Sequence, residues 1–395
     1  MSSRRILWTL FLVLIVGGVL LLYRGTEKRA PAAPLGATLQ IAHPLGLPAV
    51  AVPAENPPTA ATIELGRQLY YDPVLSVDNS ISCATCHHPD YGFADGKSFS
   101  NGVRAQKGTR NSPTVLNTAY FNTLFWDGRA ATLEEQAAGP VQNPVEMGHS
   151  LKGVENKLMR YPAYRDAFTR AFGSGHVTFE MVARAIASFE RTLVSGNSPF
   201  DRYYYGHEEN ALSASAKRGL LVFARADKGN CAACHEIGKD YALFTDNKFH
   251  NVGVGVHNEQ PTDLGRWAVT KNDADRGAFR TPTLRNIART GPYMHDGSLK
   301  TLKEVVDFYI GAGNSNPYLD KRIKPLDFLT GRERADLVAF LESLTGETPA
   351  NVGEPQNHAG AAHSLPQQLG AEILIVTKGA TLVLLGKKLY RVDLT

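Results

Sequence analysis

Four stretches of the chain carry apolar residues at the spacing of an amphipathic helix. The first covers residues 61–71, and a matching stretch covers 215–226. Two further stretches, 179–193 and 332–344, place apolar residues three, four or seven positions apart. These residues are Val182, Ile186, Phe189 and Leu193 in one and Leu337, Phe340, Leu341 and Leu344 in the other. The pattern therefore predicts four helices and a mainly α-helical protein.

Two regions interrupt the helical pattern. Residues 25–56 are rich in Pro and Ala with little periodicity, which predicts an extended linker. After residue 348, a segment containing Pro, Gly and His leads to two apolar runs, 373–376 and 381–385, with a short turn between them. This arrangement predicts a β-hairpin-like extension over 348–395, to which the sequence assigns no function.

The most apolar stretch lies at the N-terminus. Ile6–Tyr23 is an almost unbroken apolar run behind Arg4 and Arg5, and its length is sufficient to span a membrane. Basic residues follow at once, so an uncleaved anchor over 1–24 is favoured over a cleaved signal peptide, although the Pro/Ala-rich segment keeps cleavage open. Either way, we expect the body of the chain to be exported and the N-terminus to stay in the cytoplasm.

Composition indicates an ordinary globular protein and excludes one class of partner. The 395 residues are 43% hydrophobic and 20% charged, which fits two folded domains. The net charge is +4, but residues 1–29 hold five basic residues and one acidic residue, so 37 of each sign remain. The folded part lacks the basic excess of a nucleic-acid-binding protein, and no nucleic-acid partner is expected.

The cysteines indicate the chemistry. The chain has four, and all of them fall in two Cys-x-x-Cys-His motifs. The motifs consist of Cys83, Cys86 and His87, and of Cys231, Cys234 and His235. This is the attachment pattern of c-type haem, in which two thiols bond the porphyrin and the adjoining imidazole binds the iron. A zinc site or a redox Cys-x-x-Cys is the alternative, but two complete copies with no cysteine left over favour two covalently bound haems.

The first motif follows the predicted helix at 61–71, and the second follows the one at 215–226. A helix, a loop and a haem motif, in this order, begin a cytochrome c domain. The recurrence indicates an internal duplication. A polar, turn-rich segment at 195–213 separates the two copies. We therefore place an N-terminal cytochrome c domain at 57–205 and a C-terminal one at 206–347.

The sixth coordination position of each iron decides between electron transfer and substrate activation. Residues 101–114, which follow the first motif, contain no His, Met, Cys or Tyr. His88 adjoins His87 and is poorly placed as a distal ligand, so a surface histidine is favoured. The first haem is therefore predicted to be open on its distal side.

Four further segments, in this order, resemble the bacterial diheme cytochrome c peroxidase and MauG family. They are FWDGRA at 125–130, GPVQNPVEMG at 139–148, FRTPTLRN at 279–286 and GPYMHDG at 291–297. The resemblance covers about residues 57–345. It implies two cytochrome c-like haem domains in tandem, the first with a peroxidatic haem and the second with an electron-transfer haem.

The resemblance also implies roles around the first haem. Gln136 and Glu146 match the family's distal-pocket glutamine and glutamate, and Trp126 matches the tryptophan between the haems. A carboxyl group over an open iron suits peroxide cleavage, because a proton must move between the peroxide oxygens. A surface Glu and a core Trp are the alternatives from the sequence alone. Val103 stands where members that need reductive activation have a distal histidine, and valine cannot bind iron.

At the second haem, the resemblance implies Tyr309 as the distal iron ligand. Tyr309 shares a helical face with Leu302 and Val306, so a buried core tyrosine is the alternative. Standard peroxidases have a methionine at this position, whereas MauG has a tyrosine. Met294 and His295 are rival ligands, which the family places beside the haems but not on the iron. A phenolate ligand would stabilise ferric and higher oxidation states.

The family also holds a calcium ion between its domains, with an asparagine side chain and two backbone carbonyls. The matching residues are Asn111, Thr290 and Pro292. Waters must complete the six to eight oxygens that calcium prefers. A lone asparagine is otherwise a turn residue.

These features predict a periplasmic peroxidase, anchored to the inner membrane by residues 1–24, that reduces hydrogen peroxide with electrons from a small cytochrome c or cupredoxin. One alternative is a MauG-like enzyme that oxidises side chains of a partner protein. Asp227–Asn230 weakens that alternative, because MauG has a surface tryptophan there. Another alternative is a non-enzymatic diheme electron carrier or redox sensor. The oligomeric state is left open, with a homodimer as one option.

Overall fold

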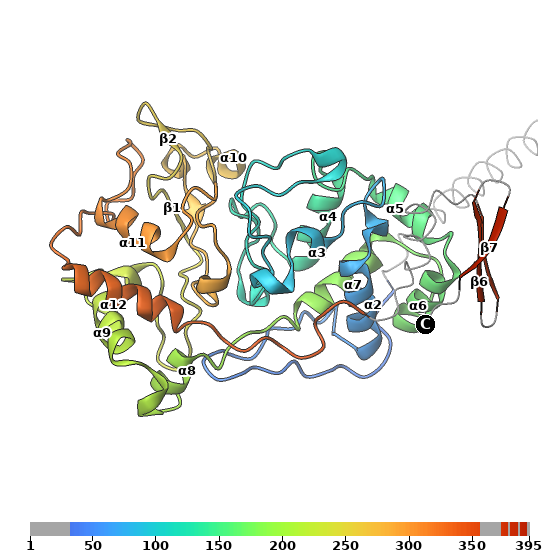
Figure 1. The fold of residues 1–395 in the computed structure, drawn as a ribbon, viewed down its shortest axis with the longest axis horizontal. Helices are drawn as coiled ribbons and strands as arrows, with labels where there is room; N and C mark the ends of the chain where they lie inside the picture. Colours follow the sequence, from blue (N-terminus) through green and yellow to red (C-terminus); the bar gives the residue numbers. More distant parts are fainter. Residues whose placement is uncertain (1–31, 356–372, 378–379, 386–387, 393–395) are drawn as a thin grey trace, which may run out of the picture. The chain divides into compact units, whose positions relative to one another are not determined.

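The computed structural model describes residues 32–355 in full and residues 373–377, 380–385 and 388–392 as backbone. The first region holds α2 (Ala60–Tyr71), α3 (Cys83–Cys86), α4 (Leu133–Gln142), α5 (Leu151–Leu158), α6 (Pro162–Phe172) and α7 (Phe179–Glu190). The second holds α8 (Pro199–Tyr204), α9 (Ala214–Ala224), α10 (Trp267–Thr270), α11 (Leu302–Ile310) and α12 (Gly331–Glu342). The described part is mainly α-helical, as predicted (Figure 1).

The strands of the second region are only two residues long. β1 (Phe249–His250) pairs antiparallel with β4 (Phe279–Arg280), and β2 (Val256–His257) pairs antiparallel with β3 (Gln260–Pro261). They shape loops and do not form a layer of the fold.

The C-terminal tail forms a separate antiparallel sheet of three strands. They are β5 (Ile373–Thr377), β6 (Ala380–Leu385) and β7 (Lys388–Val392). β5 and β6 coincide with the two apolar runs expected to form a hairpin, and β7 adds a strand that was not predicted.

The four helices predicted from apolar spacing are α2, α7, α9 and α12, and their ends fall within a few residues of the predicted ones. Capping residues fix where two of them begin. The Thr59 side chain accepts a hydrogen bond from the Thr62 N–H at the start of α2, and Thr330 and Glu333 form a reciprocal capping box at the start of α12.

The two helix pairs pack in the same way. α2 lies against α7, and α9 lies against α12 (Figure 1). A glycine stands at each crossing: a Cβ on Gly66 would overlap the Ala185 carbonyl of α7, and a Cβ on Gly219 would overlap the Asp336 carbonyl of α12. Only glycine permits such a close approach of two backbones. The repeated crossing is the structural counterpart of the duplicated haem motif.

Each helix pair contributes to its own apolar core. The first core includes Tyr70, Tyr71, Phe93, Phe189 and Leu193, and the second includes Phe200, Phe223, Phe244, Phe340 and Leu344. Burial of each large apolar side chain contributes about 1.5–3 kcal/mol. Phe200 belongs to the second core although it precedes the domain boundary placed between 205 and 206, and that boundary stays a prediction.

A short segment, residues 44–48, turns at Leu45 and Gly46 and contacts both regions, and we call it the strap. The Tyr120 hydroxyl of the first region donates a hydrogen bond to the Pro48 carbonyl at 2.9 Å. The buried guanidinium of Arg285, in the second region, donates to the Gly46 carbonyl at 2.6 Å. The strap therefore links the two regions through its backbone carbonyls.

Within the ranges that the structure describes, no helix is both long enough and apolar enough to cross a membrane. The apolar run Ile6–Tyr23, predicted as an anchor, lies outside the described residues.

Candidate functional site

The first haem motif is held by α2 and α3. Cys83 and Cys86 lie at the two ends of α3, and His87 follows directly. The His87 Nδ1–H donates to the Phe93 carbonyl at 3.2 Å, and the Tyr70 hydroxyl donates to the His87 carbonyl at 3.0 Å. Burial lowers the pKa of His87. The structure therefore holds a neutral imidazole with Nε2 as the atom suited to a metal.

The second motif repeats this arrangement. Its cysteines flank a short 3-10 turn, and the His235 Nδ1–H donates to the Phe244 carbonyl at 2.9 Å. Burial lowers the pKa of His235 as well. A cavity of about 500 Å³ adjoins the motif, and apolar side chains such as Phe223, Val306 and Leu341 line much of it. Two thiols and an oriented imidazole at an apolar cavity fit a covalently attached haem.

The four cysteines form no disulfide, and their thiols are not activated. Burial raises the pKa of Cys86 to about 11 and that of Cys231 to about 12, and it raises the pKa of Cys83 and Cys234 too. Reactive Cys-x-x-Cys pairs have the opposite property, a thiol pKa lowered by electropositive surroundings. The surroundings of the cysteines therefore do not favour a thiol–disulfide exchange site.

The loop after the first motif packs against the segment that carries Glu146. The Val103 N–H donates to the Glu146 carbonyl at 2.8 Å, and the Val103 side chain is buried. A Cβ on Gly102 would overlap the Val145 carbonyl. After burial, the charges of Asp95 and Glu146 are further causes of the raised pKa of the Cys86 thiol, so Glu146 lies near the first motif. The structure thus brings Val103 and Glu146 together at this motif.

Glu146 has the electrostatic character of a proton-transfer group. Burial raises its pKa, while a hydrogen bond with Asn143 and the charge of Arg129 partly oppose that shift. A carboxyl group with a raised pKa exchanges protons more readily near neutral pH. Gln136 is half-buried on α4, which begins at the capping residue Thr132.

Trp126 connects the two regions. Its indole N–H donates to the Asn111 carbonyl at 2.8 Å, and its own carbonyl accepts a hydrogen bond from the Arg280 N–H of β4 at 2.8 Å. The indole lines the same cavity as His235 and Tyr309. Trp126 is therefore a residue of the first region that borders the site of the second.

Tyr309 lies on α11 and lines the cavity next to the second motif. Leu302, Val306 and Ile310 of this helix are buried and also line the cavity, whereas Tyr309 is half-buried. The phenol is thus a polar group in a mainly apolar wall. Burial, with smaller effects of the two motif cysteines, raises the pKa of the Tyr309 phenol, and a metal cation in the cavity would oppose that shift.

The other residues considered as ligands have different surroundings. Met294 and His295 both line the cavity. The His295 ring stacks on Phe279 with a centroid distance of 3.7 Å, and its carbonyl accepts a hydrogen bond from the Asn111 N–H at 2.7 Å. His88 is exposed, as expected for a surface histidine, and its Nδ1 accepts a hydrogen bond from the Asp90 N–H.

The three residues predicted to bind calcium all line the same cavity. They are Asn111, Thr290 and Pro292. The Asn111 side-chain amide donates to the Lys97 carbonyl at 2.8 Å, which leaves its Oδ1 oxygen as the side-chain atom suited to a cation. The structure therefore places all three residues at one cavity, although Thr290 and Pro292 lie far from Asn111 in sequence.

An ion-pair network between the regions was not predicted from the sequence. Arg110 makes two hydrogen bonds to the Asp263 carboxylate, at 2.7 and 2.9 Å, and a third to Asp127 at 2.6 Å. Asp127 also pairs with Arg129 at 2.9 Å. This network adjoins Trp126 in sequence. Its partners are 153 residues apart, so no local pattern could have indicated it.

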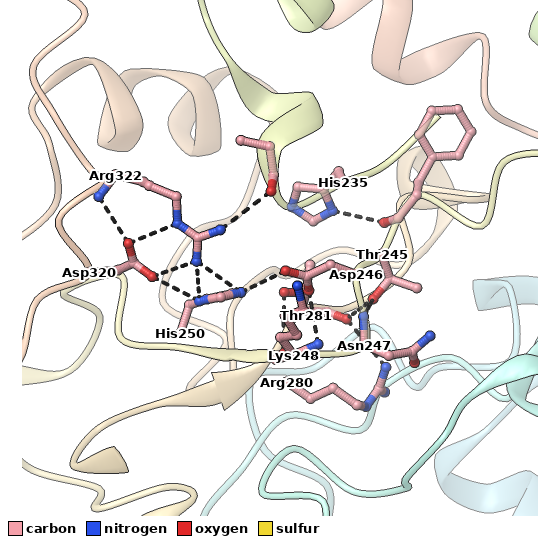
Figure 2. A network of polar contacts seen from close by, with 12 residues as sticks. His235, Thr245, Asp246, Asn247, Lys248, His250, Arg280, Thr281, Asp320 and Arg322 are labelled. Carbon is pink, nitrogen blue, oxygen red and sulfur yellow. Dashed lines mark hydrogen bonds and ion pairs between the residues drawn. The ribbon is translucent and has the colours of Figure 1, made fainter. Parts of the chain in front are cut away.

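Figure 2 shows a second unpredicted network, next to the second motif. His250 lies between two carboxylates: its Nε2 is 2.8 Å from Asp246, and its Nδ1 is 2.8 Å from Asp320. Arg322 pairs with Asp320 at 2.7 Å. Cys234, Asp246 and His250 each offer one potential metal-ligand atom within 4.8 Å of one another. The guanidinium of Arg322 at His250 opposes a cation there, and the sulfur of Cys234 is expected to bond a haem.

Comparison with known proteins agrees with this geometry. Residues 60–209 match the family described as di-haem cytochrome c peroxidase, and residues 216–345 match the cytochrome c family. The chain is 44% identical over 307 residues to the methylamine utilization protein MauG of Methylorubrum extorquens, covering 77% of this chain and 83% of that protein. It is 40% identical over 346 residues to the cytochrome-c peroxidase IdrP1 of Pseudomonas sp. (strain SCT), covering 81% and 90%.

A solved structure supports the same assignment. A MauG-like protein associated with microbial copper homeostasis superposes with a TM-score of 0.73 at 32% identity, covering 80% of this chain and 98% of that one. The two cytochrome c domains imply two c-type haems. The chain is an oxidoreductase that belongs to the di-haem cytochrome c peroxidase and MauG family.

Proposed function

We propose that the protein reduces hydrogen peroxide to water at the haem of Cys83, Cys86 and His87, with electrons that a small donor protein delivers through the haem of Cys231, Cys234 and His235. The observation that carries this proposal is the buried Val103, hydrogen-bonded to the segment of Glu146. Because valine offers no ligand atom, the first haem is available to peroxide in its oxidised state.

When bound, the two haems supply the redox-active irons, and the protein supplies proton handling and electron paths. Peroxide takes up two electrons and two protons to give two molecules of water. The Glu146 carboxylate accepts a proton from one peroxide oxygen and returns it to the other, which turns the departing oxygen into water. Gln136, on the neighbouring helix, orients the peroxide by hydrogen bonding.

Trp126 provides an aromatic ring between the two sites, and its hydrogen bonds to both regions fix its position. At the second site, Tyr309 would bind the iron when the haem is present. A phenolate ligand favours oxidised iron, so it would let the second haem hold oxidising equivalents. Asn111, Thr290 and Pro292 would supply oxygen ligands to a calcium ion at the cavity.

Two observations favour a second candidate function, oxidation of side chains in a partner protein as in a MauG-like enzyme. One is the identity to MauG, and the other is Tyr309 at the second site. Asp227 does not fit the electron path to the partner protein that MauG uses, because it forms an exposed ion pair with Arg225 where MauG has a surface tryptophan. The family suggests a periplasmic location, and we propose Ile6–Tyr23 as its membrane anchor.

The test is to add peroxide to the ferric holoprotein as isolated, in parallel with a small cytochrome c, a cupredoxin, or no donor. We expect peroxide to be consumed without prior reduction and one donor to be oxidised in proportion. Consumption coupled to modification of an added protein, with no donor oxidised, would favour the MauG-like function. Two low-spin irons and no reaction with peroxide would contradict both enzymatic proposals and favour the electron carrier.

A further inference from the structure

The glycines at the two helix crossings align the first and second regions residue by residue. Four residues from each glycine stands an aromatic ring that packs on an aromatic ring of the opposite helix. The pairs are Tyr70 with Phe189, at a centroid distance of 5.2 Å, and Phe223 with Phe340, at 4.9 Å. The helix positions beside one haem motif can therefore be matched with those beside the other.

The two regions differ at the position that follows Phe189 in α7 and Phe340 in α12. In α12 it is Leu341, which is 6% exposed and lines the cavity beside the second motif. In α7 it is Glu190, which is also 6% exposed. Burial first, and then the charge of Glu190, raises the pKa of Cys83, so this carboxyl lies near the first motif. A buried acid thus replaces a buried leucine where a haem is expected.

The charge of Glu190 lacks a dedicated partner. The adjacent Arg191 directs two nitrogens to Glu134 of α4, at 2.7 and 3.0 Å. Among the described residues, Oε2 of Glu190 has no hydrogen-bond partner. The groups that face it are Cys83 of α3, Tyr70 of α2, Glu134 and Arg191. Burial raises the pKa of Glu190 to about 8, with Arg191 lowering it and Glu134 raising it.

A buried polar atom without a partner destabilises the folded protein, and the second region shows that leucine fits this position. We propose that Glu190 is a redox-linked proton-binding residue, which takes up a proton when the first haem gains an electron. This role rests on the proposed haem at Cys83–His87. An electron added to a buried site disfavours a second negative charge nearby, because little water screens the two.

The coupled step is balanced in charge and atoms. The donor protein loses one electron, the iron of the first haem goes from ferric to ferrous, and one proton from solvent bonds to the Glu190 carboxylate. The net charge of the buried site is then unchanged. Coupling is reciprocal, so protonation of Glu190 favours reduction as much as reduction favours protonation. Leu341, at the matching position beside the second motif, cannot bind a proton.

The test is a spectroelectrochemical titration of the holoprotein between about pH 6 and pH 9, in which each haem is followed by its own absorption. The potential of the first haem should fall as pH rises, by up to about 59 mV for each tenfold decrease in proton concentration. Glu190→Gln and Glu190→Leu should remove most of this slope. The matched control is Glu180→Gln, on the exposed side of the same helix, which should leave the slope unchanged.

The proposed role of Glu190 is overturned if the potential of the first haem does not change with pH in the unmodified protein, whether or not the variants fold. An unchanged slope in Glu190→Gln would overturn it too. Loss of the peroxide reaction with an intact slope would contradict only the proposed function. A haem-stain assay that finds no haem at the first motif would contradict both proposals.

Discussion

The two haem regions share a scaffold and differ in the side chains that surround each motif. Both have a helix pair that crosses at a glycine and an imidazole whose Nδ1 is held by a backbone carbonyl. Near the first motif stand two carboxyl groups with raised pKa, Glu146 and Glu190. Near the second stand Tyr309 and the apolar Leu341, and the network of charged groups around His250 lies beside them. The duplicated packing is thus retained, while the first copy holds carboxyl groups with raised pKa and the second holds charged groups that are paired with one another.

The largest expected effect comes from giving the first region the ligand that it lacks. Val103→His places an imidazole in the loop after the first motif, where it can bind the first iron. We expect the ferric protein to become fully low-spin and its reaction with peroxide to slow by about tenfold or more until it is reduced. Stopped-flow absorption and electron paramagnetic resonance measure the two effects.

Val103→Leu controls for added side-chain volume at this buried position. It should keep the high-spin ferric signal. If Val103→His reacts with peroxide as fast as the unmodified ferric protein, the loop does not face the iron, and the proposed difference between the two haems is wrong.

The next effect concerns proton transfer. Glu146→Gln should lower the rate of peroxide consumption by about 10²–10⁴-fold, because glutamine cannot accept a proton. Glu146 acts as a base in its ionised form, so the rate should fall as pH drops through its pKa. Since burial raises that pKa, the fall should begin at a higher pH than for an ordinary glutamate.

A matched control is Glu135→Gln, which changes an exposed glutamate in the first turn of α4. The rate of peroxide consumption and its pH profile should be the same in this variant as in the unmodified protein. Normal turnover in Glu146→Gln would remove this residue from proton transfer.

A third change tests the second site by itself. Tyr309→Phe should convert the second haem to a high-spin or a different low-spin species and raise its potential, because the phenolate is lost. The spectrum of the first haem should not change. Tyr293→Phe removes a hydroxyl from another tyrosine at the same cavity and should leave the spectrum of the second haem as it is. An unchanged spectrum in Tyr309→Phe excludes it as a ligand.

The smallest expected effect concerns the contact between the regions. Arg110→Ala leaves Asp127 and Asp263 without their shared cation and should lower the free energy of unfolding by about 2–4 kcal/mol. Chemical denaturation measures it. Lys152→Ala, which removes an exposed ion pair within one helix, should cost less than about 1 kcal/mol. Equal effects of the two changes would mean that the regions do not depend on Arg110.

Periodicity was sufficient to place the helices that carry the duplication. The positions of Leu337, Phe340 and Leu341 fix the inner face of α12 with no tertiary information, because 3.6-residue spacing is a local property. The strand β7 was missed, since its pairing with β6 depends on a neighbour and not on its own short pattern.

The candidate site was likewise predictable only where its residues lie close together in sequence. The haem motifs are local, so spacing alone indicated them. Glu190 was missed for a physical reason: on an amphipathic helix, a single acid between Phe189 and Arg191 is indistinguishable from a solvated one until its burial is known. The roles of Gln136, Glu146, Trp126 and Tyr309 came from resemblance, and the structure places three of them at the haem motifs or the cavity. Those roles stay predictions.

The strap has a consequence for the order of assembly. Its Gly46 carbonyl is bound by Arg285, which is separated from it by 239 residues and is itself paired with the buried Asp201. A contact of such long sequence separation can form only after most of the chain has been made, and it forms slowly. Residues 44–48 are synthesised early, but their contact with Arg285 forms late. Both cysteine pairs are therefore synthesised before the strap closes, which leaves an interval for the covalent attachment of their haems.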